Sequence, residues 1–497
     1  MQSSSHIPAP PAVPQGLFEQ VVCGGYCIGC GACAVVSPSR FSIEMDEFGC
    51  YQAVTLPNPA DQAEGDAAGA AVCPFSASAI SEDEVAREVF PADARAHDAV
   101  GRFLETFAGY VLEDGYRNRG SSGGMVSWMA KELLQRDLVD GIVHAKAGPG
   151  SSPLFQYGIS RSVEELNRHP KSKYYPVELS SVLRELEQEP GRFAIIALPC
   201  FAKALRALFR QQPNLREKIP FIIGLFCGHL KSANYAENYG WQLGIDPGQL
   251  TAVDFRVKLS DRSANHYGIK VEGQKNGAAI SVTHDHQSLF GANWGFGFFK
   301  YSACDYCDDV TAELADISIG DAWIDPYMKD PMGTNIVVIR HPVLRDVIRE
   351  GISNGHISMD EVTADDVMRS QASGIRHRRE GLAYRLYLKQ KAGLWVPPKR
   401  VRPSRDLSRE RRSIYRLRIR LSAESHRAFR QARRAGDYDL FRRQMTPIIE
   451  RYRDHYARDH FHRLRRRIKR ILPRILGERM TRMFVRLWRG GIAPGTS

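Results

Sequence analysis

Apolar runs alternate with amphipathic stretches through the middle of the chain, from about Gly101 to His341. Several runs are apolar on both faces, which is typical of strands buried in the core of a sheet. The predicted strands are LVDGIVHAK, RFAIIALPC, IPFIIGLFC, ADISIG and NIVVIR. In GMVSWMAKELLQRD and CFAKALRALFRQ, apolar residues recur three and four positions apart, as they do in amphipathic helices. This alternation of strands and helices predicts an α/β core.

The segments that flank this core have other patterns. Residues 1–16 are rich in Pro and Ser, and we expect a disordered arm there. A cysteine-rich module follows at 17–81, and the acidic segment SEDEVAREVF predicts a connecting helix. The core is assigned to 101–345, and the region 359–497 has a largely helical pattern. The sequence therefore predicts an α+β chain whose central part is α/β.

Charge is distributed unevenly along these parts. The 497-residue chain has a net charge of +12. From Pro397 to the end there are 30 Lys and Arg against 9 Asp and Glu, so the preceding residues carry a net negative charge. An acidic body with a basic tail is typical of an appendage that meets an anionic surface, whether phospholipid, nucleic acid or acidic protein.

Ten cysteines are too few for a disulfide scaffold in a chain of this length, and their clustering predicts metal ligands in a reducing compartment. The segment CIGCGAC carries Cys27, Cys30 and Cys33 at a spacing that can turn three thiolates toward one [4Fe–4S] cluster. Cys73, which precedes Pro74, is the fourth ligand expected. These four cysteines are called the first cysteine set below.

Two details of this segment refine the prediction. Gly29 and Gly31 permit the tight backbone that converging thiolates need. In bacterial two-cluster ferredoxins a further Cys-Pro ligates the other cluster, but this chain has Ser37-Pro38 at the equivalent position. The segment 17–81 is therefore predicted to be a ferredoxin-type domain that holds one cluster.

Other interpretations of these cysteines remain. A zinc knuckle is the alternative for the first cysteine set, although zinc sites usually pair two Cys-x-x-Cys arms. Cys23 and Cys50 are surplus to the set. Cys23 can replace a ligand, but we interpret both residues as unligated thiols.

Cys200, Cys227, Cys304 and Cys307 form the second cysteine set. The first two follow consecutive predicted strands, and the last two lie in a short Cys-x-x-Cys loop. Ligands at the carboxyl edge of an α/β sheet, together with such a loop, can form a second four-sulfur cage. The alternative is that a buried cysteine at a strand end serves only as a small apolar residue.

Six segments carry a family resemblance between about Val22 and Arg340. They are CIGCGACAVVSP, SSGGMVSWMAKELLQRDLVDGIV, KSKYYP, ALPCFAKALRAL, GLFCGHL and CDYCDDVTAELADISIGDAW. In this order they resemble the beta subunits of coenzyme F420 hydrogenases and dehydrogenases, whose relatives include a plant chlorophyll-cycle reductase and bacterial proteins encoded with polysaccharide genes. The resemblance implies that the second cysteine set holds a [4Fe–4S] cluster and that the core binds FAD. The implied architecture is a ferredoxin-like module, a flavin-binding α/β core and a helical basic tail.

The expected flavin site lies at the start of a helix. Ser121, Ser122, Gly123 and Gly124 directly precede a predicted helix that begins near Met125. Backbone N–H groups and the positive dipole end at such a position suit a diphosphate. Ordinary N-capping by Ser122 is the alternative, and the resemblance favours FAD binding.

Further candidates surround this segment. Arg117 and Arg119 can add positive charge, and Lys173 and Tyr174 are candidates for contacting flavin or substrate. Asp321 ends a predicted strand and can fix the Cys304–Cys307 loop, contact the cofactor or cap a turn. His229, beside Cys227, can donate a proton or tune a cluster, or it can be an ordinary core residue.

The expected function follows from the implied cofactors. A flavin exchanges electron pairs whereas each cluster passes single electrons, so the protein is expected to be an oxidoreductase that converts between the two. We expect ferredoxin or another redox partner, with electrons entering through the first cysteine set or leaving by it. The alternatives are a non-catalytic electron-transfer subunit and a membrane-associated accessory protein of polysaccharide biosynthesis.

The end of the basic tail has a pattern of its own. From Ile468 to Trp488, apolar residues and arginines alternate with the spacing of a cationic amphipathic helix, which is typical of interfacial membrane anchors. Packing on the acidic body is the alternative, and no motif predicts specific nucleic-acid binding. Without a secretory signal or a long apolar run, we expect a cytoplasmic protein, with peripheral contact at the inner face of the membrane as an option.

Overall fold

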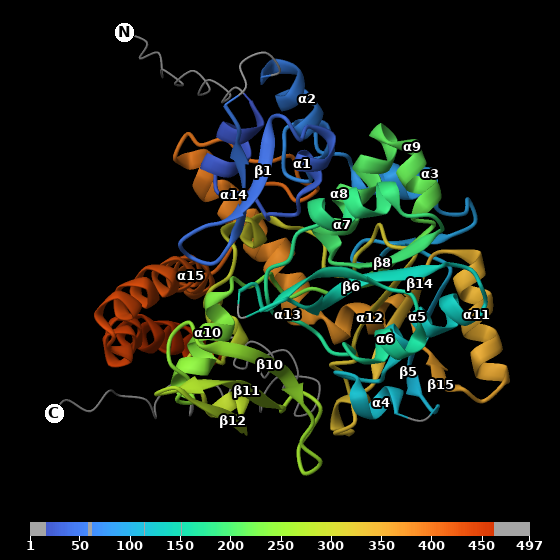
Figure 1. The fold of residues 1–497 in the computed structure, drawn as a ribbon. Helices are drawn as coiled ribbons and strands as arrows, with labels where there is room; N and C mark the ends of the chain where they lie inside the picture. The colour runs from blue at the N-terminus through green and yellow to red at the C-terminus, as the bar shows by residue number, and fades with distance from the viewer. Residues whose placement is uncertain (1–15, 58–61, 114, 151, 462–497) are drawn as a thin grey trace, which may run out of the picture.

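The computed structural model describes residues 16–57, 62–113, 115–150 and 152–461. At its centre is a sheet of eight strands in the order β15-β5-β14-β13-β9-β8-β6-β7 (Figure 1). The strands are β5 (Glu105–Val111), β6 (Gly141–Ala147), β7 (Phe155–Ser160), β8 (Phe193–Ala197), β9 (Phe221–Leu225), β13 (Ile317–Asp321), β14 (Asn335–Ile339) and β15 (Ile357–Glu361). β6, β8, β9 and β13 are parallel, and each remaining strand is antiparallel to its neighbours. The chain is thus a mixed α/β protein.

All five strands predicted from apolar runs belong to this sheet, as β6, β8, β9, β13 and β14. Alternate residues of these strands face two different cores, as the pleat of a sheet requires. Ile195 and Ile222 belong to one buried cluster, whereas Ala194 and Ile223 belong to the other. The sheet is therefore covered on both faces, which explains why its central strands are apolar throughout.

Helices cover both faces of the sheet. On one face α5 (Met125–Gln135) buries Trp128 and Met129, and α11 (Pro342–Ser353) packs in the same cluster. On the other face lie α7 (Ser180–Gln188) and α8 (Pro199–Gln211). The shorter helices and strands around the sheet are α3 (Glu82–Val89), β3 (Arg95–His97), β4 (Gly101–Phe103), α4 (Tyr116–Arg119), α6 (Val163–Asn167) and α9 (Pro213–Lys218).

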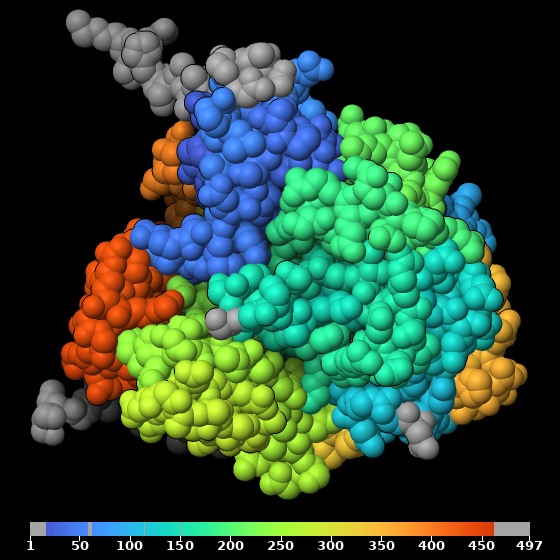
Figure 2. Space-filling view, in the orientation of Figure 1, coloured from blue at the N-terminus to red at the C-terminus, as the bar shows by residue number. Residues whose placement is uncertain are grey.

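The N-terminal module packs directly on the core (Figure 2). Its elements are the π-helical turn η1 (Phe18–Cys23), α1 (Ala32–Val36), β1 (Phe41–Met45), β2 (Tyr51–Thr55) and α2 (Gln62–Val72). β1 and β2 form an antiparallel hairpin. The backbone N–H of Tyr51 donates a hydrogen bond to the Tyr301 hydroxyl at 2.7 Å, and the Ser302 hydroxyl donates to the carbonyl of Gly25 at 2.6 Å. The module therefore contacts the loop that carries Cys304 and Cys307.

A second sheet is inserted between β9 and β13. Its antiparallel strands are β10 (Leu250–Val257), β11 (Gly268–Lys275) and β12 (Ala278–Asp285), and α10 (Asn234–Gln242) precedes them. Asn276 and Gly277 join β11 to β12 with φ values of 50° and 78°, as expected of a tight hairpin turn. Short 3-10 turns follow as η3 (His286–Ser288), η4 (Trp294–Phe296), η5 (Ser302–Tyr306) and η6 (Tyr327–Lys329).

The C-terminal region is largely helical, but it starts differently from the prediction. Met359 lies within β15, an edge strand of the main sheet, so the expected boundary at 359 cuts through an element. The helices that follow are α12 (Ala364–Ser370), α13 (Ala372–Arg376), the π-helical turn η7 (His377–Gly381), α14 (Leu382–Lys391) and α15 (Arg409–Ala435). Residues 438–461 form one further helix.

The described part of the basic region lies on the acidic body. Arg400 binds Glu313 at 2.8 Å, and Arg411 binds Glu380 at 2.8 Å. The expected arm and the expected amphipathic helix at 468–488 lie outside the described residues, except for residue 16. Among the helices that the structure describes, none is both long enough and apolar enough to cross a bilayer.

Candidate functional site

The four residues of the first cysteine set line one small cavity. Burial raises the pKa of the Cys33 thiol, and the thiols of the other three members of the set raise it further. Gly29 and Gly31 adopt φ values of 62° and 89°, which L residues with side chains rarely adopt. A Cβ atom at Gly29 would lie 2.2 Å from the carbonyl oxygen of Tyr51. The glycines therefore permit the tight loop, as the sequence predicts.

The thiols are spaced more widely than the ligands of a single ion. In a tetrahedral zinc site with Zn–S bonds of about 2.3 Å, the sulfurs lie about 3.8 Å apart. Among the described residues, no three cysteine sulfurs all lie within 4.8 Å of one another. The described cysteines are thus not arranged as a preformed zinc site.

The second cysteine set gathers at the carboxyl edge of the parallel strands. Cys200 lies in the first turn of α8, directly after β8, and Cys227 lies two residues beyond β9. Cys304 and Cys307 come from η5 and its end. Burial raises the pKa of the Cys200 thiol, and the other three thiols raise it further. The set is therefore brought together as predicted.

Arg378 is a part of this site that the sequence did not reveal. It lies in η7, its side chain is buried, and its Nε donates to the carbonyl of Asp309 at 2.8 Å. Burial alone would lower the pKa of Arg378, but the thiols of Cys307, Cys227 and Cys304 hold it above its ordinary value. An arginine in a helical segment far along the chain gives no local signal of such a contact.

The two cysteine sets adjoin each other. Cys30 of the first set is close enough to Cys200 of the second to raise the pKa of its thiol, after burial and the other second-set thiols. Cys50 is buried between the sets, in a cluster with Cys304 and near Cys27. Cys23, by contrast, is exposed. That both residues are unligated thiols stays a prediction.

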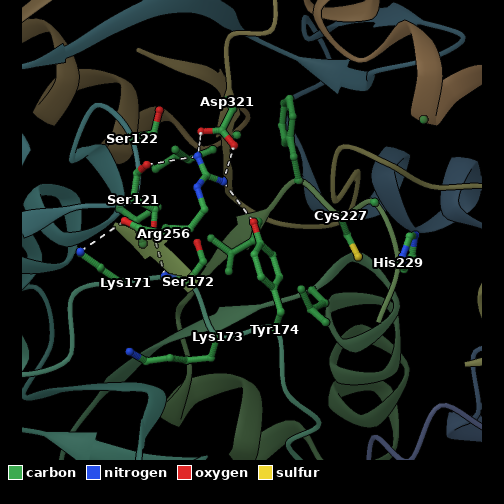
Figure 3. Close-up of a pocket in the computed structure, with 18 of the residues that line it drawn as sticks. Ser121, Ser122, Lys171, Ser172, Lys173, Tyr174, Cys227, His229, Arg256 and Asp321 are labelled. Carbon is green, nitrogen blue, oxygen red and sulfur yellow. Dashed lines mark hydrogen bonds and ion pairs between the residues drawn. The ribbon is translucent and has the colours of Figure 1, made fainter. Parts of the chain in front are cut away.

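A large cavity of about 720 Å³ opens beside the second cysteine set (Figure 3). Cys227 and His229 line it on one side, and the turn before α5 lines it on another. Of the predicted flavin-site residues, the cavity wall contains Ser121, Ser122, Gly124, Lys173 and Tyr174. The candidates His229 and Asp321 line the same cavity.

The structure agrees only in part with the predicted roles of the Ser-Ser-Gly-Gly turn. The Ser122 hydroxyl donates to the carbonyl of Thr334 at 3.0 Å and does not cap α5, whose N-cap is Gly124. The capping alternative is therefore wrong. Gly123 is not among the residues that line the cavity; its carbonyl accepts a hydrogen bond from Val111 of β5 at 2.9 Å.

Arg117 and Arg119 do not supply the expected charge. Arg117 pairs with Asp330 at 2.5 Å, and neither arginine is among the cavity-lining residues. The guanidinium that does face the Ser-Ser-Gly-Gly turn belongs to Arg256 on β10, which the sequence did not reveal.

Arg256 links three walls of the cavity (Figure 3). Its guanidinium donates to the Tyr174 hydroxyl at 3.0 Å, to Asp321 Oδ2 at 3.2 Å and to the Ser121 carbonyl at 3.1 Å. Its Nε is buried without a hydrogen-bond partner among the described residues. The Asp321 carboxylate therefore binds Arg256, a partner that no pattern in the sequence indicates.

Two other predicted residues have perturbed pKa values. Burial lowers the pKa of Lys173 to about 8, and its ammonium group lies 5.0 Å from the centre of the Phe155 ring. Burial also lowers the pKa of His229 well below its ordinary value. The His229 ring stacks on Trp294 with centroids 4.2 Å apart, and its Nε2 has no hydrogen-bond partner among the described residues.

The cavity wall is strongly cationic. Its lysines and arginines are Lys171, Lys173, Lys231, Arg256, Lys300, Arg369, Arg378 and Arg418. Asp321 is the one carboxylate among the described lining residues. Aromatic rings, including those of Tyr174 and Trp294, form much of the remaining wall. Such a cavity suits a large aromatic ligand that carries negative charge.

Comparison with known sequences identifies the family of this core. A description of the N-terminal part of the coenzyme F420 hydrogenase/dehydrogenase beta subunit matches residues 106–184, and a description of its C-terminal part matches residues 191–365. Together they cover just over half of the chain. The chain belongs to this family.

Several curated relatives of this chain are oxidoreductases or subunits of oxidoreductases. One component of the F(420)H(2) dehydrogenase of Methanosarcina mazei is 24% identical over 44% of this chain and 58% of its own length. The coenzyme F420-dependent sulfite reductase of Methanocaldococcus jannaschii is 23% identical over 82% of this chain and 63% of its own length. The chain thus spans about 60% of the length of these relatives. An oxidoreductase or electron-transfer role is the common element.

A solved structure shows a partial likeness. The F420-reducing [NiFe] hydrogenase complex of Methanosarcina barkeri contains a chain that matches 61% of this chain and 99% of its own length, with 16% identity and a TM-score of 0.46.

The family match covers only part of the site. The second cysteine set and the turn before α5 lie within residues 106–184 and 191–365. The first cysteine set precedes the matched residues, and Arg378 and Arg418 follow them. The C-terminal helices therefore add walls to the large cavity that the family descriptions do not include.

Proposed function

We propose that this protein holds a [4Fe–4S] cluster at each cysteine set and FAD in the large cavity, and that it passes electrons between one-electron and two-electron carriers. The position of Cys227 carries the proposal, because this residue belongs to the second cysteine set and also lines the large cavity. The first set adjoins the second through Cys30 and Cys200. The first cysteine set, the second cysteine set and the large cavity therefore adjoin one another in that order.

The cysteine sets fit clusters in number, burial and charge. Each set offers four thiols, which is the ligand number of a [4Fe–4S] cluster. Among the described residues, no three of their sulfurs lie within 4.8 Å of one another. A buried guanidinium at the second set needs negative charge nearby, and thiolates around an iron–sulfur cluster provide it.

The large cavity fits FAD in size and in chemistry. Its volume of about 720 Å³ lies within the usual range of cofactor sites. The first turn of α5 lines it, and Gly124 at its N-cap has no side chain. Asn335 Oδ1 accepts from the backbone N–H of Met125 at 3.2 Å, so a diphosphate would bind the N–H groups that follow Met125. The unpartnered Nε of Arg256 provides a further donor beside this turn.

The chemistry follows from these assignments. FAD, when bound, exchanges electron pairs with a substrate and single electrons with a cluster. Tyr174 and Trp294 supply apolar surface that excludes water, and Arg256 with Lys173 supplies positive charge for an anionic cofactor. Ferredoxin or a related iron–sulfur protein is the proposed one-electron partner.

A relay subunit without a reaction of its own is the second candidate. The names of several relatives, such as F420-dependent formate dehydrogenase 1 subunit beta, describe subunits of oxidoreductases. If the isolated protein with bound FAD reduces a small molecule, the protein is an enzyme in its own right. If it binds FAD but reduces no small molecule, the relay subunit is favoured.

Flavin reduction by a one-electron donor tests the proposal. After anaerobic reconstitution with iron, sulfide and FAD, reduced ferredoxin is expected to bleach the flavin absorbance of the native protein. The Cys307→Ala variant is expected to keep FAD but to be bleached at least about tenfold more slowly, because the second cluster is lost. Cys23→Ala, which alters an exposed cysteine outside both sets, is the control and should behave as the native protein. Failure to bind FAD, or equal rates in Cys307→Ala, would refute the proposal.

A further inference from the structure

The charge around the second cysteine set is dominated by Arg378. Its guanidinium is buried and lines the large cavity together with Cys227. Its Nε lies 2.8 Å from the carbonyl oxygen of Asp309, and the Cys307 sulfur lies 3.3 Å from the same oxygen. The Nη1 of Arg378 has no hydrogen-bond partner among the described residues. Arginine keeps its proton in proteins, so this positive charge is permanent.

Two neighbouring cations, Lys300 and Arg385, share one carboxylate, whereas Arg378 is paired with none among the described residues. Lys300 binds Asp305 at 2.5 Å, and Arg385 lies 3.5 Å from the same carboxylate. The hydrogen bond that Arg378 donates from Nε ends on the carbonyl of Asp309, which carries no net charge. The field of the Arg378 guanidinium therefore acts mainly on the cysteine sulfurs.

The first cysteine set lies in contrasting surroundings. Among the described residues, the wall of its cavity contains only cysteines, glycines and apolar or aromatic residues, such as Leu17, Val21 and Phe75. Lys203 acts on Cys73 of this set but is paired with Glu82 at 2.9 Å. No lysine or arginine therefore lines the cavity of the first set within the described part of the chain.

We propose that Arg378 raises the reduction potential of the second cysteine set above that of the first. Reduction adds one negative charge, which a nearby guanidinium and hydrogen bonds to the sulfurs stabilise. One electron held at the first set is then stabilised by moving to the second, beside the large cavity. The inference rests on the proposed function, because it requires a cluster at each set.

Arg378 is also a feature of this chain outside the matched family region. That match ends at residue 365, and Arg378 reaches the cysteines from the π-helical turn η7. Single π-helical turns inside helices are frequent at functional sites because they displace a side chain from the regular helical position. The C-terminal segment thus sets the electrostatics of a site whose ligands lie elsewhere.

A redox titration monitored by electron paramagnetic resonance tests the inference on the reconstituted full chain. Cys73→Ala and Cys307→Ala, each lacking one set, assign the two signals. In the native protein the second set is expected to titrate at the higher potential. In the Arg378→Gln protein, the equilibrium constant for one-electron reduction of the second set is expected to fall at least about tenfold, which lowers its reduction potential by about 59 mV. Arg378→Lys, which keeps the charge, should shift it less.

Arg376→Gln is the matched control, because Arg376 is close in sequence but is not among the residues that line the cavity. It should move neither potential. An Arg378→Gln protein with full iron content and unchanged potentials would overturn the inference. So would a native second set that titrates at or below the first, a result that does not depend on how the variant folds. Iron for fewer than two clusters in the native protein would instead refute the proposed function.

Discussion

At the scale of single residues, Arg256 organises the wall of the large cavity. It lies on β10 and binds Asp321 at the end of β13, Tyr174 before α7 and Ser121 before α5. Both charged side chains of the Arg256–Asp321 pair are largely buried. Removing one partner would leave the other as an unpaired charge in the protein interior.

Replacing Asp321 by Ala is therefore expected to be strongly destabilising. We expect the free energy of unfolding to fall by about 3–5 kcal/mol, measured by denaturant unfolding of the FAD-free protein. The double variant with Arg256→Met should recover part of this loss, because no charge is then left unpaired. Asp325→Ala, at an exposed pair with Lys329, is the control and should change stability by less than about 0.5 kcal/mol. Equal effects at the two aspartates would contradict the role assigned to Asp321.

At the scale of elements, strand ends place most of the predicted site residues. β8, β9 and β13 end at one edge of the sheet, and the chain continues there to Cys200, Cys227 and Asp321. Apolar runs with cysteines or a carboxylate at their ends predicted this edge. Arg256 and Arg378 could not be predicted in this way. They reach the site through contacts between segments far apart in sequence, and neither lies in a motif.

The turn before α5 provides a prediction at this scale. Gly124 has φ of 89°, and a Cβ atom there would lie 2.8 Å from the backbone carbonyl group of Tyr116. Gly124→Ala is therefore expected to destabilise the protein by about 1–3 kcal/mol and to weaken FAD binding, because the turn must shift. Thermal unfolding and flavin fluorescence measure the two effects. Gly150→Ala, at an open position outside the left-handed region, is the control and should change neither stability nor FAD binding. A Gly124→Ala protein as stable as this control, with the same FAD binding, would contradict the strain inferred at Gly124.

At the scale of the whole molecule, the N-terminal module, the inserted sheet and the C-terminal helices meet the α/β core around the two cysteine sets and the large cavity. The N-terminal module brings Cys30 toward Cys200, and the inserted sheet brings Arg256 to the large cavity. The C-terminal helices supply Arg378 and Arg418. Strand–helix alternation predicted the core, but the inserted sheet and the path of the C-terminal helices depend on long-range packing that local patterns do not encode.

The iron content of each cysteine set tests the central claim most directly. After anaerobic reconstitution, the native chain is expected to bind about eight irons and eight sulfides, four at each set. Cys73→Ala and Cys307→Ala are each expected to lose about half of this content while the other half remains. Fewer than about six irons in the native chain, or loss of all iron in both variants without unfolding, would contradict two separate clusters.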